Sequence, residues 1–254
     1  MDEMRLLIDL HRPAQRQGPG DNAHTLRAIE LSGLAQRQQL KVADIGCGTG
    51  ASTLVLAQAL DADLTALDFL PEFLTELRQR AEQAGLGGRI TCRASSMDAL
   101  DFAPNSLDAI WSEGAIYNIG FENGVRTWHQ YLKPGGVLAV SELTWLSAER
   151  PAELHAYWHA QYPEVGTAAQ KIAVLERHGY SPLGYFVLDD ACWLDAYYRP
   201  MQQRFAAFLH QHDHSEAARA IVAQEESEIA LYEKYRSFFS YGFYIARKNV
   251  AISA

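Results

Sequence analysis

A glycine-rich segment in the first quarter of the chain has the residue types needed to hold a nucleotide-like ligand. An apolar run containing Val42 leads to Asp44, and glycines follow at Gly46, Gly48 and Gly50 before a helical pattern begins. Because glycine has no side chain, such a turn can approach a ligand closely and adopt backbone angles that other residues avoid. The order strand, tight turn, helix therefore predicts a cofactor site at the carboxyl end of a strand.

The cofactor class is not decided by the glycines alone. Gly46, Gly48 and Ala51 also fit the G-x-G-x-x-G/A pattern of dinucleotide-binding proteins. Asp68 ends the next apolar run, about 20 residues after the glycines, where a carboxylate can accept hydrogen bonds from a ribose. It can equally cap the helix predicted from Pro71. An NAD-linked oxidoreductase therefore remains an alternative at this point.

The segment D-x-G-x-G-x-G resembles the first motif of class I S-adenosylmethionine-dependent methyltransferases. Residues 95–102 are similar to the family segment G-D-A-x-x-L-P-F, residues 106–113 to its fourth strand, and residues 131–140 to its L-x-P-G-G turn into strand five. The resemblance covers about residues 40–143 and is greatest to the small-molecule branch related to the methyltransferases of ubiquinone and menaquinone biosynthesis. It implies an α/β, Rossmann-like, doubly wound sheet of seven strands, mostly parallel with an antiparallel last strand.

Aromatic and helical segments around this core predict a cap and a lid on a single domain. We expect an N-terminal helical cap at about 1–38, a core at 39–145, helical lid insertions at about 147–177 and 192–237, and a closing strand at about 241–248.

The resemblance implies S-adenosylmethionine as cofactor and S-adenosylhomocysteine as product. The usual acid facing the adenine amino group is replaced by Ser96, so adenine recognition would rely on the Met97 backbone. Arg16, in the turn Arg-Gln-Gly-Pro-Gly, would meet the methionine carboxylate, although the turn can also simply join two helices. The residues expected to bind the cofactor are Arg16, Asp44, Gly46, Cys47, Gly48, Gly50, Asp68, Phe69, Ser96, Met97 and Glu113.

Methyl transfer is an in-line displacement that depends on alignment and on exclusion of water. A phenol, an alcohol or a carbon acid would also need a base. The candidate bases are Glu113, Tyr117, Glu142 and His11, and each has a structural alternative as a cofactor contact, packing residue, buried hydrogen-bond partner or surface residue.

Aromatic residues near the expected carboxyl edge of the sheet are candidates for contact with the acceptor. The residues expected to bind it are Tyr117, Glu142, Trp145, Trp193 and Tyr198. Aromatic residues at helical spacing are also typical of a core. Acids mixed with aromatics (Glu142, Asp189, Asp190, Asp195) would suit an amine, whereas an apolar acceptor would use the aromatics alone, so N-, O- and C-methylation all stay open.

The net charge of −9 and the lack of a dense basic cluster argue against a nucleic-acid partner. The three cysteines form no C-x-x-C pair, and no apolar run approaches the ~20 residues of a membrane span, so we expect a cytoplasmic protein without membrane insertion. Imidazoles two residues apart in His210–His214 do not share a helix face, so no metal site is predicted. The oligomeric state is left open, with a homodimer as one option. A methyltransferase-like protein that binds the cofactor without turnover is a further alternative.

Overall fold

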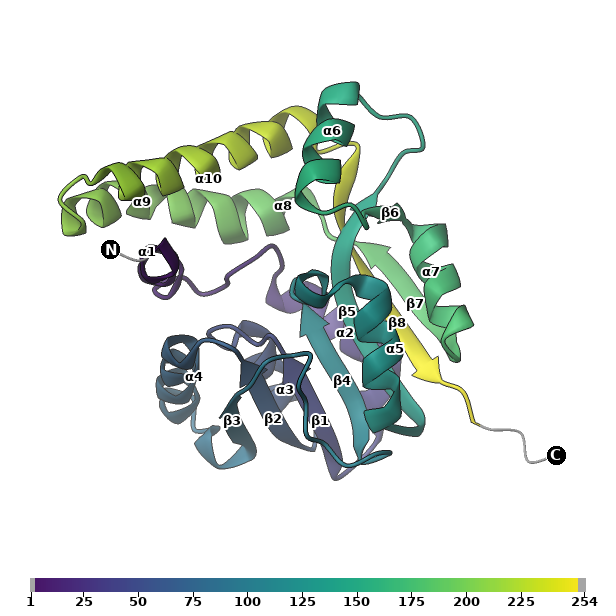
Figure 1. Ribbon diagram of the computed structural model, residues 1–254. Coiled ribbons are helices and arrows are strands. Elements are labelled where there is room, and N and C mark those ends of the chain that lie inside the picture. Colours follow the sequence, from purple (N-terminus) through teal and green to yellow (C-terminus); the bar gives the residue numbers. More distant parts are fainter. Residues whose placement is uncertain (1–2, 251–254) are drawn as a thin grey trace.

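An eight-stranded sheet runs through the computed structural model, which describes residues 3–250 (Figure 1). The strand order is β3-β2-β1-β4-β5-β8-β7, with the two-residue β6 paired to β5. All pairings are parallel except those of β8 with β5 and β7. The strands are β1 (Leu40–Ile45), β2 (Ala62–Asp68), β3 (Ile90–Ala94), β4 (Leu107–Glu113), β5 (Leu132–Trp145), β6 (Gly166–Thr167), β7 (Tyr180–Val187) and β8 (Phe239–Lys248).

This architecture confirms the predicted Rossmann-like fold with an antiparallel last strand. The addition to the predicted seven strands is β6, which is too short to leave a pattern in the sequence.

Alternate residues of the central strands divide the core into two layers. On β4, Trp111 packs with Leu56 and Ile29 on one face, whereas Ile110 packs with Phe121 and Val125 on the other. Because successive side chains of a strand point to opposite faces, a strand buried on both faces carries apolar residues at consecutive positions, as residues 109–111 do here. A continuous apolar run of this kind is typical of a strand covered by helices on both sides.

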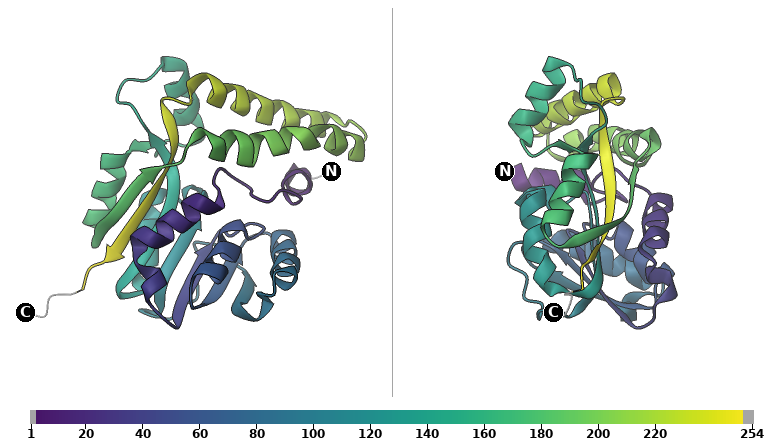
Figure 2. Two further views of the ribbon diagram at one scale, coloured as in Figure 1. Left: turned by 180° about the vertical axis from the view of Figure 1, so that it is seen from behind. Right: turned by 90° about the vertical axis from the view of Figure 1, so that its right-hand side faces the viewer.

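The helices cover both faces of the sheet (Figure 2). Helices α2 and α3 contribute to the layer on the Trp111 face and α5 and α7 to the opposite layer. The helices are α1 (Glu3–His11), α2 (Asn22–Ser32), α3 (Ala51–Ala59), α4 (Pro71–Gln83), α5 (Phe121–Trp128), α6 (Ala152–Gln161), α7 (Ala168–Arg177), α8 (Asp190–Trp193), α9 (Arg199–Gln211) and α10 (Glu216–Tyr235).

A helical hairpin of α9 and α10 extends beyond the carboxyl ends of β1, β2 and β4, and α1 lies between the hairpin and this edge of the sheet (Figures 1 and 2). The turn between the two helices falls at 212–215 and contains two of the histidines of the run, His212 and His214. A π-helical segment, Leu194–Tyr198, joins α8 to α9, and such segments are frequent at functional sites. Over the described residues, no helix combines the length and apolar character needed to span a bilayer.

Candidate functional site

A cavity of about 500 Å³ opens at the carboxyl ends of β1, β2 and β4, where a doubly wound sheet is expected to bind ligands. The glycine turn forms its floor through Gly46, Cys47 and Gly48. Burial raises the pKa of the Cys47 thiol well above its usual range, so this group stays protonated and uncharged. We call this space the first cavity.

The three glycines of the turn are required for different reasons. A Cβ on Gly46 would lie 2.4 Å from Cβ of Ala115, and one on Gly48 would lie 2.4 Å from Oε1 of Gln17. Gly50 does not line the cavity; its φ of +90° and the 2.1 Å between an added Cβ and Cδ1 of Leu77 show a packing requirement against α4. Gly50 therefore has a structural role, and it does not make the cofactor contact that the sequence predicts.

Asp44 also lies away from the cavity, contrary to expectation. Its carboxyl is completely buried beneath the turn, where Oδ2 accepts hydrogen bonds from Ser52 (2.8 Å) and Thr53 (2.7 Å). Burial raises the pKa of Asp44 to about 7, and its Oδ1 has no hydrogen-bond partner. The side chain ties β1 to the first turn of α3 and so fixes the shape of the glycine turn.

Asp68 lines the first cavity from the end of β2. Its Oδ2 accepts from the Gly48 backbone N–H (2.8 Å) and its Oδ1 from the Leu70 backbone N–H (2.9 Å). Burial raises the pKa of this carboxyl, and the backbone donors partly oppose that effect. Each oxygen keeps a lone pair for a ligand. Phe69 beside it is 70% exposed and lines the same cavity.

Ser96, Met97 and Asp98, which follow β3, also line this cavity. The Ser96 hydroxyl donates a hydrogen bond to the Asp98 carboxylate, so an acid is present two residues after the position where the family pattern predicts one. The Met97 carbonyl accepts a bond from Nε1 of Trp128 (3.0 Å), which fixes this loop.

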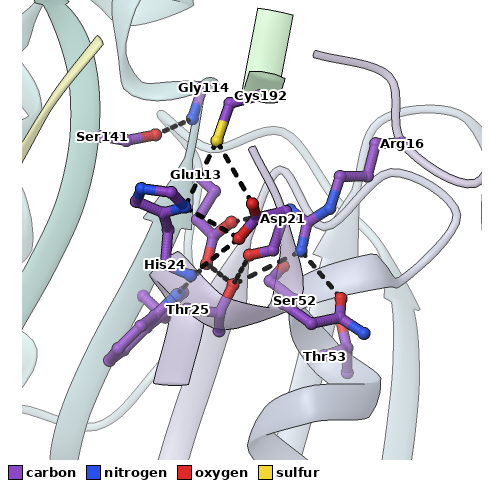
Figure 3. A network of polar contacts seen from close by, with 12 residues as sticks. Arg16, Asp21, His24, Thr25, Ser52, Thr53, Glu113, Gly114, Ser141 and Cys192 are labelled. Carbon is purple, nitrogen blue, oxygen red and sulfur yellow. Dashed lines mark hydrogen bonds and ion pairs between the residues drawn. The ribbon is translucent and has the colours of Figure 1, made fainter. Parts of the chain in front are cut away.

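Arg16 and Glu113 form an ion pair at the edge of the first cavity (Figure 3). Nη1 of Arg16 lies 2.9 Å from Oε2 of Glu113, and each side chain is only 9% exposed. Oε1 of Glu113 accepts from the Thr25 hydroxyl (2.8 Å) and from Nε1 of Trp111 (2.9 Å). The pair therefore presents one positive and one negative group, both held in fixed positions.

A second polar cluster, next to this pair in Figure 3, contains Asp21, His24 and Cys192, whose ligand-type atoms lie within 4.8 Å of one another. Asp21 caps α2 by accepting from the His24 backbone N–H (2.8 Å), and Asp189 caps α8 by accepting from the Cys192 backbone N–H (3.3 Å). The two helices meet at Cys192, whose Sγ lies 3.6 Å from Oδ2 of Asp21 and 3.3 Å from Nδ1 of His24. The sequence gives no hint of the cluster because Cys192 is 168 positions from His24.

An adjoining cavity of about 470 Å³ lies between the sheet edge, α1, α6 and α10. The two cavities meet along α1 and the turn after it, the start of α4 and the end of β4, because both are lined by Met4, Gln17, Gly18, Pro19, Leu70, Phe73, Gly114 and Tyr117. We call the adjoining space the second cavity.

Three of the residues predicted for chemistry or acceptor binding line the second cavity. Tyr117 stands at the junction of the two cavities and is 44% exposed. His11 has Nε2 at 3.4 Å from Oε1 of Glu225. Trp193 stacks on Tyr232 at 4.5 Å between ring centroids and donates Nε1–H to the Ser240 hydroxyl.

The structure places Glu142, Trp145 and Tyr198 in the interior rather than on either cavity. Glu142 pairs with Nζ of Lys171 at 3.3 Å, and burial raises the pKa of its carboxyl to about 6. Trp145 donates to the Val165 carbonyl (3.1 Å), and Tyr198 donates to Glu228 (2.9 Å). These three side chains hold the cavity walls in place.

The acids expected beside the aromatics are also elsewhere. Asp189, Asp190 and Asp195 are exposed; Asp190 pairs with Arg236 (3.1 Å) and Asp195 with Arg199. The acids that line the second cavity are Glu225 and Glu228 of α10. Their three-residue spacing was the available signal, but the same spacing is common on solvated helix faces.

Comparison with known proteins identifies the core. Residues 42–136 match the family described as "Methyltransferase domain". The chain is 34% identical over 115 residues to the ubiquinone/menaquinone biosynthesis C-methyltransferase UbiE of Cereibacter sphaeroides, covering 44% of this chain and 46% of the relative. It is 27% identical to the sterol 24-C-methyltransferase erg-4 of Neurospora crassa, covering 53% of this chain and 36% of the relative. The matched part is thus less than half of these relatives' length.

Solved structures share the fold over nearly the whole chain. A SAM-dependent methyltransferase from Geobacter sulfurreducens, in complex with S-adenosyl-L-homocysteine, superposes with a TM-score of 0.81 at 19% identity, covering 95% of this chain and 97% of the other. The similarity therefore extends to the segments outside residues 42–136, including the helices that surround the second cavity.

Proposed function

We propose that the chain is a class I S-adenosylmethionine-dependent methyltransferase and that it transfers a methyl group to a small-molecule acceptor; the match of residues 42–136 to the methyltransferase domain and the shared fold support this proposal. The first cavity holds the cofactor and the second cavity holds the acceptor. Helices α1, α6 and α10 cover the acceptor and act as the lid.

The observation that carries this proposal is the shared wall between the cavities. An in-line displacement needs the acceptor and the methyl donor to meet in a space that excludes water. Gly114 and Tyr117 line both cavities, so a group crossing from one to the other passes these residues. Each volume lies within the usual range of about 300–1,000 Å³ for small-molecule sites.

The polar groups of the first cavity match the chemistry of S-adenosylmethionine. Asp68 offers carboxylate lone pairs to a ribose diol. Asp98, held by Ser96, offers an acceptor to an adenine amino group. The Arg16–Glu113 pair suits a zwitterion, because Arg16 can bind the carboxylate of the methionine part and Glu113 its ammonium group.

When bound, S-adenosylmethionine supplies an electrophilic methyl carbon on a sulfonium. The protein's part is to orient the two reactants and to exclude water. Gln17 closes the turn over the glycines, since its Oε1 accepts from the Thr49 backbone N–H at 2.8 Å. Tyr117 supplies a wall at the junction of the cavities. Glu113 is already bonded to three donors, which makes it a binding residue rather than a free base.

Calorimetric titration with S-adenosylhomocysteine tests the proposal directly. We expect micromolar binding to the wild type and at least tenfold weaker binding to Asp68→Ala, equivalent to about 1.4 kcal/mol. Asp63→Ala, which removes an exposed carboxylate of the same strand, is the matched control and should bind as the wild type does. Thermal unfolding of each variant verifies that the fold is kept.

Absence of binding by the folded wild type would refute the proposal. Stabilisation by NAD in place of S-adenosylhomocysteine would favour the oxidoreductase alternative. If the protein binds S-adenosylmethionine but forms no S-adenosylhomocysteine with any amine, phenol or carbon acid tested, a cofactor-binding protein without turnover would be favoured instead.

A further inference from the structure

The second cavity carries negative charge that nothing in its wall balances fully. Its lining includes Glu225 and Glu228, and none of its lining residues within 3–250 is a lysine or an arginine. His11 is the one basic side chain in that described lining, and it lies 3.4 Å from Glu225. A pair of acids in a partly buried cavity is costly unless a cation accompanies them.

The rest of the wall is rich in aromatic rings from four separate segments. Tyr157 and Trp158 come from α6, Tyr197 from the π-helical segment, and Trp193 and Tyr241 from α8 and β8. The Trp193 and Tyr241 rings meet edge to face with centroids 5.0 Å apart. Aromatic faces attract cations, and the attraction grows when water is excluded.

The two acids share one face of α10 because they are three residues apart. Glu228 is anchored by the Tyr198 hydroxyl, which donates to Oε1 at 2.9 Å and leaves the other oxygen for a ligand. Burial, together with the charge of Glu225, raises the pKa of Glu228. This carboxylate is therefore able to take up a proton as well as to pair with a cation.

From this arrangement we infer that the acceptor is an amine, bound with its nitrogen among these rings and beside Glu225 and Glu228. The inference rests on the proposed function and names its substrate class. An amine arriving as an ammonium ion first gives a proton to one of the two carboxylates. Its nitrogen lone pair then forms the bond to the methyl carbon while the carbon–sulfur bond breaks and its electron pair stays on sulfur.

The charges explain why this acceptor suits the cavity. Positive charge leaves the sulfonium and appears on the methylated nitrogen, so the carboxylate that remains ionised beside that nitrogen stabilises the charge as it develops. A phenol or a carbon acid would become anionic before attack, and the same two acids would oppose that ionisation.

Binding of a cation and of its neutral isostere separates these cases. With the protein saturated by S-adenosylhomocysteine, choline and 3,3-dimethylbutan-1-ol, which replaces the nitrogen by carbon, are titrated calorimetrically. We expect choline to bind at least tenfold more tightly. Glu228→Gln should remove most of this preference while the affinity for S-adenosylhomocysteine is unchanged, because glutamine still accepts from Tyr198.

Glu226→Gln, an exposed neighbour on the same helix, is the matched control and should keep the preference. Glu225→Gln gives a second, independent variant. Equal binding of the two probes to the wild type, or a preference that survives Glu225→Gln and Glu228→Gln together, would overturn the amine assignment. If the wild type does not bind S-adenosylhomocysteine at all, the proposed function itself is overturned. The failure of the amine assignment and the failure of the proposed function therefore give different results.

Discussion

Replacing Asp44 by asparagine should change how the stability of the protein depends on pH. The carboxyl is completely buried, and its pKa is raised from 3.8 to about 7, chiefly by burial. Between these two values the folded state holds a proton that the unfolded state has lost. Stability in the wild type therefore falls as pH rises through this window, by about 1.4 kcal/mol per unit.

Asparagine has nearly the shape of the protonated acid but does not titrate. Its amide oxygen can still accept from Ser52 and Thr53, which bond to a single oxygen of Asp44. The stability of Asp44→Asn relative to wild type should therefore rise by about 2.3 kcal/mol between pH 5 and pH 7 and level off at higher pH.

Urea unfolding of both proteins at pH 5, 6, 7 and 8 measures this difference. The comparison is made between variant and wild type because Glu142, with a pKa raised to about 6, titrates in both. Asp63→Asn controls for the loss of one carboxylate, since that side chain is exposed on β2. A difference that stays constant from pH 5 to pH 8, or that falls, would refute the assignment of a proton to buried Asp44.

Two further outcomes follow from the walls of the first cavity. Arg16→Gln should weaken the binding of S-adenosylhomocysteine at least tenfold, because a charged hydrogen bond worth about 1.5–3 kcal/mol is lost. The ligand 5′-methylthioadenosine lacks the amino-acid part and should bind to both proteins equally. Equal losses of affinity for the two ligands in calorimetry would contradict the role given to Arg16. Gly50→Ala should destabilise the protein by about 2 kcal/mol because its Cβ would overlap Leu77 at a positive φ. Leu77→Ala is itself destabilising because Leu77 is fully buried, so in urea unfolding the double variant should lose less stability than the sum of the two single losses, and strictly additive losses would exclude this contact.

The sequence predicted the strands of the core and the cofactor edge because those features are local. The turn from Gly46 to Gly50 and the acid at Asp68 belong to short strand–turn–helix units, whose spacing can be read directly from the chain. Asp44 shows the limit of such a reading. Its place in the motif is clear, but only the packing of α3 shows that Ser52 and Thr53 enclose it.

The acceptor side was harder to predict because its parts are distant in sequence. Trp145 ends β5 and Trp193 lies in the helix after β7, yet Trp145 is directed into the interior by its bond to Val165, whereas Trp193 reaches the second cavity. Glu228 reaches that cavity only because the α9–α10 hairpin folds back across the sheet edge (Figure 1). Periodicity within one helix holds no information about where the helix docks.

The same separation explains why the relatives do not decide the acceptor. The family match covers residues 42–136, which contain the glycine turn and Asp68 but neither Glu225 nor Glu228. Of the rings that line the second cavity, Tyr157, Trp158 and Tyr241 also lie outside the match. Substitutions in these outer segments can change acceptor charge and shape without altering the cofactor edge. We therefore expect the acids and rings of the second cavity to determine which acceptor this chain binds, and the contrast between choline and its carbon isostere measures that preference.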